Sequence, residues 1–477
     1  MRMRIVFSAW LTTLLAACSA VGPDYHGAPA TSTPAAFTRA FDESPAAPLA
    51  TWWAALGDHE LDTLVARALQ SSPTLPSVRA RLLRARAALQ ATRANAAPNV
   101  SASALYAHAR LPSLPLGGGN SGGGSSPSSL NLYNLGFDAS WEIDLFGGQR
   151  RAAESAQAAL GAAEAQLADA QVSLSAEVAQ AYVNLRATQA RLALAAAAIQ
   201  RQTRVLQLTE QREAGGTASK LDVARLRNQL EATRADVAPL EAQRDAYSDA
   251  LAFLVGAMPG TLDAELAQVT PLPLPPAQVA VGDPAALLQR RPDIRAAERV
   301  LAARSAAIGQ AEASRFPRLS FLGLIGIGGT TPGSLSQLDD FTVIAAPQLR
   351  WSFLDFGRGA ARVKSAEADR DEAEAQYRVA VLGALRDAED ALSRYSKRRV
   401  AVATAARAKG AADEAAMLMR ARLRAGTANL IEMLDAERQQ IAAEQNLLAA
   451  EAGLTGDFVS LQKALGLGWS QEAGPRS

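Results

Sequence analysis

The stretch Trp141-Glu142-Ile143-Asp144-Leu145-Phe146-Gly147 returns 210 positions later as Trp351-Ser352-Phe353-Leu354-Asp355-Phe356-Gly357, with the Trp, Phe and final Gly retained. The same interval relates a further set of residues: Ser155, Gly216, Thr217, Ala218 and Gly256 match Ser365, Gly426, Thr427, Ala428 and Gly466. Upstream the interval is 219: Pro73, Leu82, Pro98 and Ser101 match Pro292, Leu301, Pro317 and Ser320. A self-match this long predicts an internal duplication. Each half is expected to run helix, strand, loop, strand, long helix, turn, helix.

The change of interval falls between Pro98 and Trp141, where residues 117–124 read Gly-Gly-Gly-Asn-Ser-Gly-Gly-Gly. A glycine-rich loop can vary in length without disturbing the elements that it joins. We therefore expect this segment to be a flexible loop between the two strands of the first half.

A long helix is predicted from about Leu145 to Ala214, because this segment contains no proline and few glycines. Its large apolar residues recur every seven positions, with one four-residue stutter: Leu160, Leu167, Leu174, Val178, Leu185, Leu192, Ile199 and Leu206. Such a pattern is typical of a coiled-coil seam. At 1.5 Å per residue, about 70 residues give a rod of roughly 105 Å. A second long helix with a weaker seam is expected from about Phe356 to Arg424.

Strands are predicted before each long helix. Between Leu132 and Leu145 apolar residues alternate with polar ones, which indicates a strand with one apolar and one polar face. The same alternation runs from Phe341 to Phe353, although Pro347 there argues for a bend or bulge. Partner strands with a weaker pattern are expected at about Asn99 to Arg110 and Arg318 to Gly329.

Two interpretations of these strands compete. They could form a small soluble sheet that caps a helical rod, or they could cross a membrane, since each is long enough for a tilted bilayer crossing. Four strands cannot close a barrel, and open edges in lipid would leave backbone groups unpaired. The second interpretation therefore requires several chains. Dimers would supply eight strands and trimers twelve, and the residues alone do not choose between them.

The N-terminus predicts export from the cytoplasm. Arg2 and Arg4 precede an apolar stretch from Ile5 to Ala16, which suits a secretory signal. The following Leu15-Ala16-Ala17-Cys18 resembles the bacterial lipoprotein box, in which the cysteine becomes the lipidated first residue. We therefore expect a covalent lipid on Cys18 that anchors the chain to the outer membrane, and no other cofactor.

Composition excludes several classes of protein. The 48 basic and 47 acidic residues leave a formal charge of +1, so no summed field favours nucleic acid as a partner. A single cysteine excludes a disulfide framework and a cysteine-rich metal site. The 49% hydrophobic and 5% aromatic content describes an alanine-rich helix former. No apolar run reaches the roughly 18 residues of a membrane-spanning helix.

The chain resembles the TolC/OprM-type outer-membrane factors, specifically their lipoprotein (NodT-like) branch. The resemblance covers nearly the whole mature chain and rests on several stretches: Val21-Gly22-Pro23-Asp24-Tyr25, Trp52-Trp53 with Gly57-Asp58 and Leu61, Arg290-Arg291-Pro292-Asp293-Ile294-Arg295-Ala296-Ala297-Glu298, Phe316-Pro317, and Phe356-Gly357-Arg358. It implies a mainly α fold with a β-barrel part. A homotrimer would combine four strands per chain into a twelve-stranded barrel in the outer membrane, above a periplasmic barrel of coiled-coil helices.

The resemblance also implies an equatorial collar, drawn from Pro29 to Leu49, Pro271 to Pro276 and the C-terminal tail. We accordingly divide the chain into a signal peptide (1–17), a lipidated N-terminal extension (18–58), a first repeat (59–260), a Pro-rich linker (261–283), a second repeat (284–467) and a tail (468–477).

No catalytic constellation is visible, and an enzyme is not expected. His26, His59 and His108 fall in three different elements, so a metal site is not expected either. The two helix-to-helix turns are more informative: the first contains Gly216, Thr217, Ala218 and Ser219, and the second Gly426, Thr427, Ala428 and Asn429. Gly can end one helix while Ser219 or Asn429 caps the next. Glu432 and Asp435 are three residues apart, which places two carboxylates on one face of a helix.

By resemblance, these turns form the constriction at the periplasmic tip of the trimer. Asp435 and Glu432 would converge on the axis, Ile431 would form an apolar ring, and Arg422 would pair with Asp222 of the other hairpin. Where the family often has Tyr beside that Arg, this chain has Leu423. Like charges gathered on a narrow axis repel, so a closed gate would need compensating ion pairs.

The expected function is passive export of small molecules through the outer membrane. The resemblance implies a tripartite efflux system with an inner-membrane pump of the RND type and a periplasmic adaptor that docks on the Gly-Thr-Ala turns and opens the gate. An exit duct for type I protein secretion shares the fold and is one alternative. A lipid-anchored periplasmic coiled-coil scaffold is another, although it leaves the alternating strands unexplained. Nothing in the sequence identifies the exported substrates.

Overall fold

The computed structural model describes residues 20–30, 34–39, 50–111, 128–336, 339 and 341–469. The predicted signal peptide, Cys18, the glycine-rich loop at 117–124 and most of the C-terminal tail lie outside these residues. The chain divides into two compact units: Met1–Pro29, Leu83–Gly161 and Glu298–Gln376 form unit 1, and Ala30–Leu82, Ala162–Ala297 and Tyr377–Ser477 form unit 2. Each unit therefore takes residues from both repeats.

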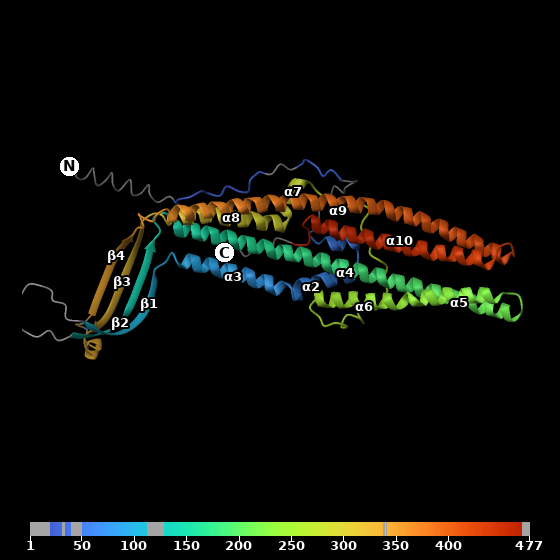
Figure 1. Cartoon of the computed structure of the whole chain (residues 1–477), viewed down its shortest axis with the longest axis horizontal. Coiled ribbons are helices and arrows are strands. Elements are labelled where there is room, and N and C mark those ends of the chain that lie inside the picture. The colour runs from blue at the N-terminus through green and yellow to red at the C-terminus, as the bar shows by residue number, and fades with distance from the viewer. Residues whose placement is uncertain are drawn as a thin grey trace, which may run out of the picture. The chain divides into compact units, whose positions relative to one another are not determined.

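The predicted order of elements is confirmed in both repeats (Figure 1). The first contains α2 (His59–Ser71), α3 (Leu75–Ala94), β1 (Asn99–Leu111), β2 (Ser128–Ile143), α4 (Gly148–Ala214), α5 (Lys220–Ala235) and α6 (Val237–Leu254). The second contains α7 (Pro284–Arg290), α8 (Pro292–Ala313), β3 (Arg318–Gly329), β4 (Phe341–Arg350), α9 (Arg358–Arg424) and α10 (Leu430–Ala464). Short 3₁₀ helices span Trp52–Leu56 and Pro332–Ser336. Among the described residues, we find no helix with the length and hydropathy needed to cross a membrane.

The two long helices, α4 and α9, have 67 residues each. The predicted seam of α4 is confirmed, because its residues are buried or half-buried: Leu160, Leu167, Leu174, Val178, Leu185, Leu192, Ile199 and Leu206. The repeats differ after the turn, where α10 is continuous but α5 and α6 are separate helices. Pro239 explains the break, since it cannot donate a hydrogen bond to the carbonyl of Ala235, the last residue of α5. The second repeat has Ala449 at the matching position.

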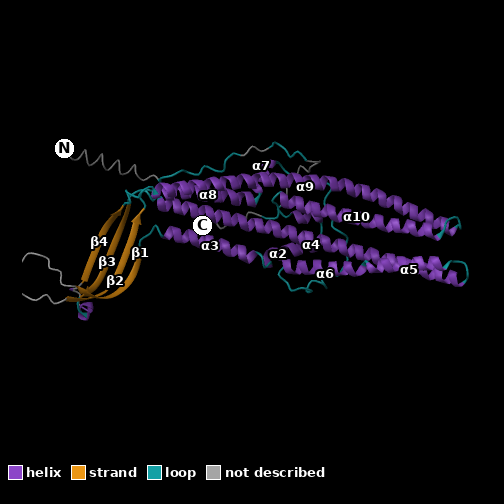
Figure 2. Ribbon diagram, in the orientation of Figure 1, coloured by secondary structure: helices purple, strands orange, loops and turns teal. Residues whose placement is uncertain are grey.

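The four strands form one antiparallel sheet in the order β1-β2-β3-β4 (Figure 2). The central pairing of β2 with β3 joins the two repeats. The expected bend or bulge at Pro347 is wrong: β4 pairs with β3 in unbroken register from Phe341 opposite Ile327 to Arg350 opposite Arg318. Because β4 is an edge strand of this sheet, the missing N–H of Pro347 is tolerated there.

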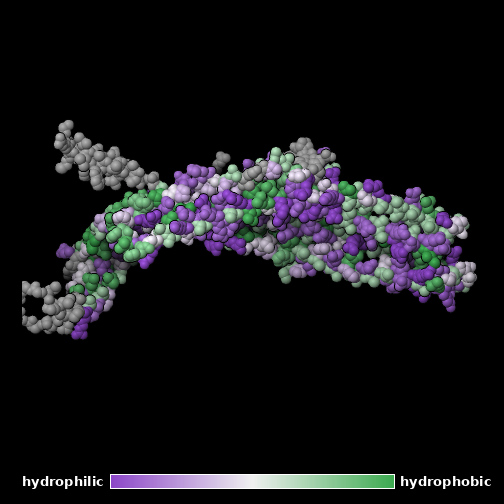
Figure 3. Space-filling view, turned by 45° about the horizontal axis from the view of Figure 1, so that its top comes forward, coloured by the Kyte–Doolittle hydropathy of each residue, from purple (hydrophilic) through white to green (hydrophobic). Residues whose placement is uncertain are grey.

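The register gives the sheet one face on which apolar residues from all four strands lie opposite one another. Opposite one another on this face lie Ala102, Phe137, Ile325 and Val343, one from each strand. Many of these side chains are exposed, including Phe137 at 60% and Val343 at 61%. Figure 3 shows hydrophobic residues gathered over the strands of unit 1. The other face is mixed, with polar residues such as Ser101, Asp138 and Glu142 and with apolar residues such as Leu105, Leu322 and Ile344.

Unit 2 contains a fully buried guanidinium near its core. Arg186 of α4 forms an ion pair with Glu60 of α2 and donates to the carbonyl of Gln268 at 2.7 Å. The hydroxyl of Tyr182 donates to Asp58, which also caps α2. These contacts tie α2 and the segment after α6 to the long helix, and breaking such a buried pair costs several kcal/mol, about 3 to 5.

Candidate functional site

The first helix-to-helix turn is closed by backbone and side-chain hydrogen bonds. Gly216 has φ of +74°, a left-handed conformation that favours glycine, and the amide of Thr217 donates to the carbonyl of Arg212 at 2.7 Å. Ser219 caps α5 by accepting from the amide of Asp222, and the Asp222 carboxylate accepts from the amide of Ser219. The predicted cap is therefore a capping box.

The second turn repeats this geometry. Gly426 has φ of +75°, and the amide of Thr427 donates to the carbonyl of Arg422 at 3.0 Å. Asn429 caps α10 by accepting from the amide of Glu432, whose carboxylate accepts from the amide of Asn429. Two turns with the same closure, one per repeat, present Thr217-Ala218 and Thr427-Ala428 at the ends of the hairpins.

The two hairpins pack against each other near these turns (Figure 2). Leu206 of α4 and Val223, Leu226 and Leu230 of α5 form a buried apolar cluster. Leu430 and Leu434 of α10 pack against it. This contact fixes the rotation of α10, because Leu430 and Leu434 occupy one side of its first turn.

The side chains of interest on α10 lie outside that contact. Ile431 is 49% exposed, and Leu221, its equivalent in the first repeat, is 58% exposed. Asp435 forms an ion pair with Arg438 and accepts from Gln439 Nε2 at 3.0 Å. The predicted pair of carboxylates is thus divided between two tasks, since Glu432 closes the capping box while Asp435 interacts along the helix.

Arg225 occupies the position in the first repeat that Asp435 occupies in the second, 210 residues later. A carboxylate in one hairpin therefore corresponds to a guanidinium in the other. The self-match at 210 positions contains this difference. It was missed from the sequence because only the residues that are identical in both repeats were used.

The expected pair of Arg422 with Asp222 is absent from the described part of this single chain. Asp222 accepts from Ser219, and Arg422 Nη2 donates to the carbonyl of Thr427 at 3.2 Å. Both side chains are engaged by their own turn, because each caps or braces a backbone that has unpaired groups at a helix end.

Glu437 lies two residues beyond Asp435 and is half-buried. Burial raises the pKa of its carboxyl, although Arg420 and Arg201 act in the opposite direction. A raised pKa in the folded state means that this packing is most stable when Glu437 is protonated. The contribution of Glu437 to the free energy of unfolding is fully present below the ordinary pKa of a glutamate, and it is lost as pH rises through the raised pKa.

In unit 1, the segment after the predicted lipidation site is held by Arg151 of α4. Its guanidinium donates to the carbonyls of Val21 and Gly22 and to the Asp24 carboxylate, the last at 2.7 Å. Tyr25 donates to Glu298 of α8 at 2.8 Å, which joins two of the stretches quoted above. Arg151 was not singled out from the sequence, since one more Arg on a helix carries no signal. Cys18 itself lies outside the described residues.

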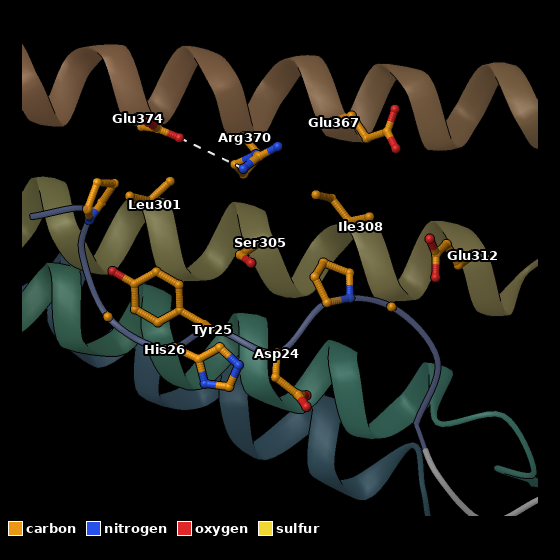
Figure 4. Close-up of a pocket in the computed structure, with 14 residues that line it drawn as sticks. Asp24, Tyr25, His26, Leu301, Ser305, Ile308, Glu312, Glu367, Arg370 and Glu374 are labelled. Atoms are coloured by element: carbon orange, nitrogen blue, oxygen red, sulfur yellow. Dashed lines mark ion pairs between the residues drawn. The ribbon is translucent and has the colours of Figure 1, made fainter.

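A cavity of about 660 Å³ lies between this segment, α8 and α9. Figure 4 shows Tyr25 on the side of the segment toward α8, which carries Leu301 and Ser305, and shows Arg370 of α9 paired with Glu374. Its lining is mostly polar and acidic. Within the described ranges, no group of three or more His, Cys, Asp or Glu is arranged to hold a metal ion.

Comparison with known proteins gives a consistent result. The sequence model of a family described as outer membrane efflux protein matches residues 64–257 and 284–467. Nodulation protein T of Rhizobium leguminosarum bv. viciae is 29% identical over 98% of this chain and 95% of that protein. Outer membrane protein OprJ of Pseudomonas aeruginosa is 31% identical over 88% of this chain and 86% of that protein. The solved structure of the outer-membrane channel OprN has a TM-score of 0.85 and 35% identity, covering 94% of this chain and 98% of that chain.

Proposed function

The chain belongs to the outer membrane efflux protein family, and from this premise we propose that three copies close into one water-filled duct that works with a periplasmic adaptor and an inner-membrane pump. The protein is an exit channel of the Gram-negative outer membrane, and the predicted fold class, mainly α with a four-stranded sheet, is that of such channels.

The sheet supports closure by several copies. It presents an exposed apolar face and two edge strands, β1 and β4, whose outer backbone groups have no partner in the sheet of a single chain. The apolar face of β2 runs from Tyr133 to Ile143, a separation of ten residue steps or roughly 33 Å along the strand. At a tilt of about 40° this spans about 25 Å, the height of the apolar band of outer-membrane barrels. Pairing β1 of one chain with β4 of the next removes every edge from lipid.

The ends of that apolar face carry aromatic residues, as the two membrane interfaces require. Tyr106 and Tyr133 lie 5.0 Å apart between ring centroids at one end. At the other end the indole of Trp141 donates to the carbonyl of Ala96, and that of Trp351 donates to the carbonyl of Arg315. Aromatic girdles of this kind flank the lipid-facing band of transmembrane barrels. The exposed apolar face with two open edges is the observation that carries the proposal.

The hairpin turns would form the gate in the trimer. Asp435 and Glu432 would face the axis with Ile431, and bonds within each turn would hold the closed shape. We propose that an adaptor binds the Thr217-Ala218 and Thr427-Ala428 turns. Its binding opens the helices only if it has higher affinity for the open state than for the closed one. Exposed ion pairs contribute about 0 to 1 kcal/mol each, which suits a reversible gate.

The lipoprotein signature at Cys18 favours efflux of small molecules over type I secretion of proteins. No covalent step is part of the proposal, since the duct only provides a polar path.

The proposal is tested with the detergent-purified full-length protein. We expect a trimer by light scattering and stepwise conductance after addition to a planar bilayer. A monomer that stays folded without detergent and leaves the bilayer silent would instead support a periplasmic scaffold.

Replacing Arg422 with alanine is expected to increase single-channel conductance at rest severalfold, because the second turn loses the bond from Arg422 to the carbonyl of Thr427. Planar-bilayer recordings measure it. Arg424→Ala is the matched control, as Arg424 is also exposed and basic but bonds only to the helix carbonyl of Arg420. Equal conductance in the two variants would exclude Arg422 from the gate.

A further inference from the structure

The second face of the sheet differs between the two repeats. In the first repeat the part of this face nearer the helices carries Ser101, Ser103, Asn134 and Asp138, and Leu105 is its one large apolar residue. In the second repeat the corresponding part of β3 and β4 is apolar, with an arginine pair at the end of the strands that joins the helices. We call the following residues the second-repeat patch: Arg318, Leu322, Leu324, Ile344, Ala346 and Arg350.

The register defines the patch. Arg318 lies directly opposite Arg350, Leu322 opposite Ala346, and Leu324 opposite Ile344. Directly opposed residues have Cβ atoms about 4.5 to 5.5 Å apart, so each pair forms one continuous surface. Leu322 and Ile344 are 46% and 50% exposed. No residue of the described chain covers them.

The arginine pair is unusual because like charges directly opposite each other destabilise a sheet. Arg350 donates to Gln348 Oε1 at 3.4 Å, a long contact with a neutral group. The described residues provide no ion pair for either guanidinium. Glu142 lies on this face opposite Ser320, but no ion pair joins it to Arg318 among the described residues. Two guanidinium groups held together attract an anion, and arginine presents a planar fork that matches carboxylate and sulfonate oxygens.

The self-match shows which residues of the patch differ from their equivalents in the first repeat. Asn99 and Ser140 face each other in the first repeat at the positions of Arg318 and Arg350 in the second. Ser103 corresponds to Leu322, and Asn134 to Ile344. The two halves therefore have the same backbone pairing and differ at these four positions, while Leu105 and Leu324 are leucine in both halves. Packing within the sheet does not require the change, since the first repeat forms the same register with small polar residues.

We propose that the second-repeat patch is a binding site for amphipathic organic anions in transit through the duct. The anionic group would be held by Arg318 and Arg350, and the apolar body would lie on Leu322, Leu324 and Ile344. The apolar centre begins about 13 Å along the strand from the arginine pair, four residues at roughly 3.3 Å each. This matches a molecule with a charged group at one end and a rigid apolar body at the other. The inference rests on the proposed function, which places this face toward the interior.

The test uses block of single-channel current by taurocholate, added below its micellar concentration from the barrel side. We expect the variant R318N/R350S, which installs the residues of the first repeat, to need about tenfold more taurocholate for half-block, because two charge-assisted contacts are lost. The variant L322S/I344N is expected to need a similarly raised concentration of taurocholate for half-block. Arg110 lies on β1 and on the opposite face of the sheet, so taurocholate is expected to half-block Arg110→Gln at the same concentration as the parent.

Control ligands separate the two parts of the site. CHAPS shares the steroid body but is zwitterionic, and sulfate has the charge without the apolar body, so both are expected to block at least tenfold less strongly than taurocholate. Equal half-block in the parent and R318N/R350S, or equal potency of sulfate and taurocholate, would overturn the proposal.

If the protein produces no current in the planar bilayer, that result contradicts the proposed duct but not the proposed binding site. In that case fluorescence of the anionic dye 8-anilinonaphthalene-1-sulfonate is measured with the protein in nanodiscs, against empty nanodiscs. Weaker dye binding to R318N/R350S than to the parent is expected, and equal binding would overturn the patch.

Discussion

Asp435→Ala is expected to raise the concentration of hexaamminecobalt(III) that half-blocks the channel on the order of 100-fold. In the proposed trimer three Asp435 carboxylates would face one trivalent cation, and each would contribute about 1 kcal/mol at an exposed site. Since 1.4 kcal/mol is a factor of ten, losing all three gives this effect. The measurement is single-channel current in a planar bilayer, with the cation added on the side of the hairpin turns.

Two further variants serve as comparisons for Asp435→Ala. Arg438→Ala is expected to strengthen block, because Arg438 forms an ion pair with Asp435 and lowers its availability. Glu231→Gln removes an exposed carboxylate that pairs with Arg234 on α5, away from the turns, and is expected to leave block unchanged. If Asp435→Ala behaves like Glu231→Gln, the carboxylates do not reach the axis.

Val343→Lys is expected to abolish recovery of the trimer from the outer membrane. Val343 is exposed at the centre of the apolar face, opposite Ile325. A lysine at the bilayer midplane of a barrel costs about 2 to 4 kcal/mol, and the trimer would carry three of them. The amount of heat-modifiable trimer in isolated outer membranes measures the effect.

The neighbouring substitution Thr342→Lys supplies the control. Thr342 lies on the other face of β4, opposite Gly326, so its side chain would point into the duct. The same charge one residue away is expected to leave trimer recovery close to that of the parent. Similar recovery of both variants would show that neither face contacts lipid.

Periodicity in the sequence was sufficient for most of the fold. The seven-residue spacing from Leu160 to Leu206 predicted the buried face of α4, and the alternation after Leu132 predicted the two faces of β2. Pro347 was misread because its effect depends on whether a strand is central or at an edge. That position is set by long-range pairing, which a local pattern does not contain.

The contacts of the proposed gate residues were predicted less completely. The turns and their caps followed from Gly216, Ser219, Gly426 and Asn429, because capping depends on neighbours within a few residues. The partners of charged side chains did not follow. Asp435 pairs with Arg438, and Arg422 braces the carbonyl of Thr427, because a long side chain takes the nearest suitable group in space.

The sequence by itself determined the duplication, the helices, the strands and their turns, since each depends on the spacing of residues or on contacts between near neighbours in the chain. Only the tertiary structure decided that β2 pairs with β3, that Arg318 faces Arg350, and that Arg151 holds Val21 and Asp24. These contacts join residues more than 30 positions apart, and 130 in the case of Arg151 and Val21. Chain folding sets such proximity, and no local pattern of residues encodes it.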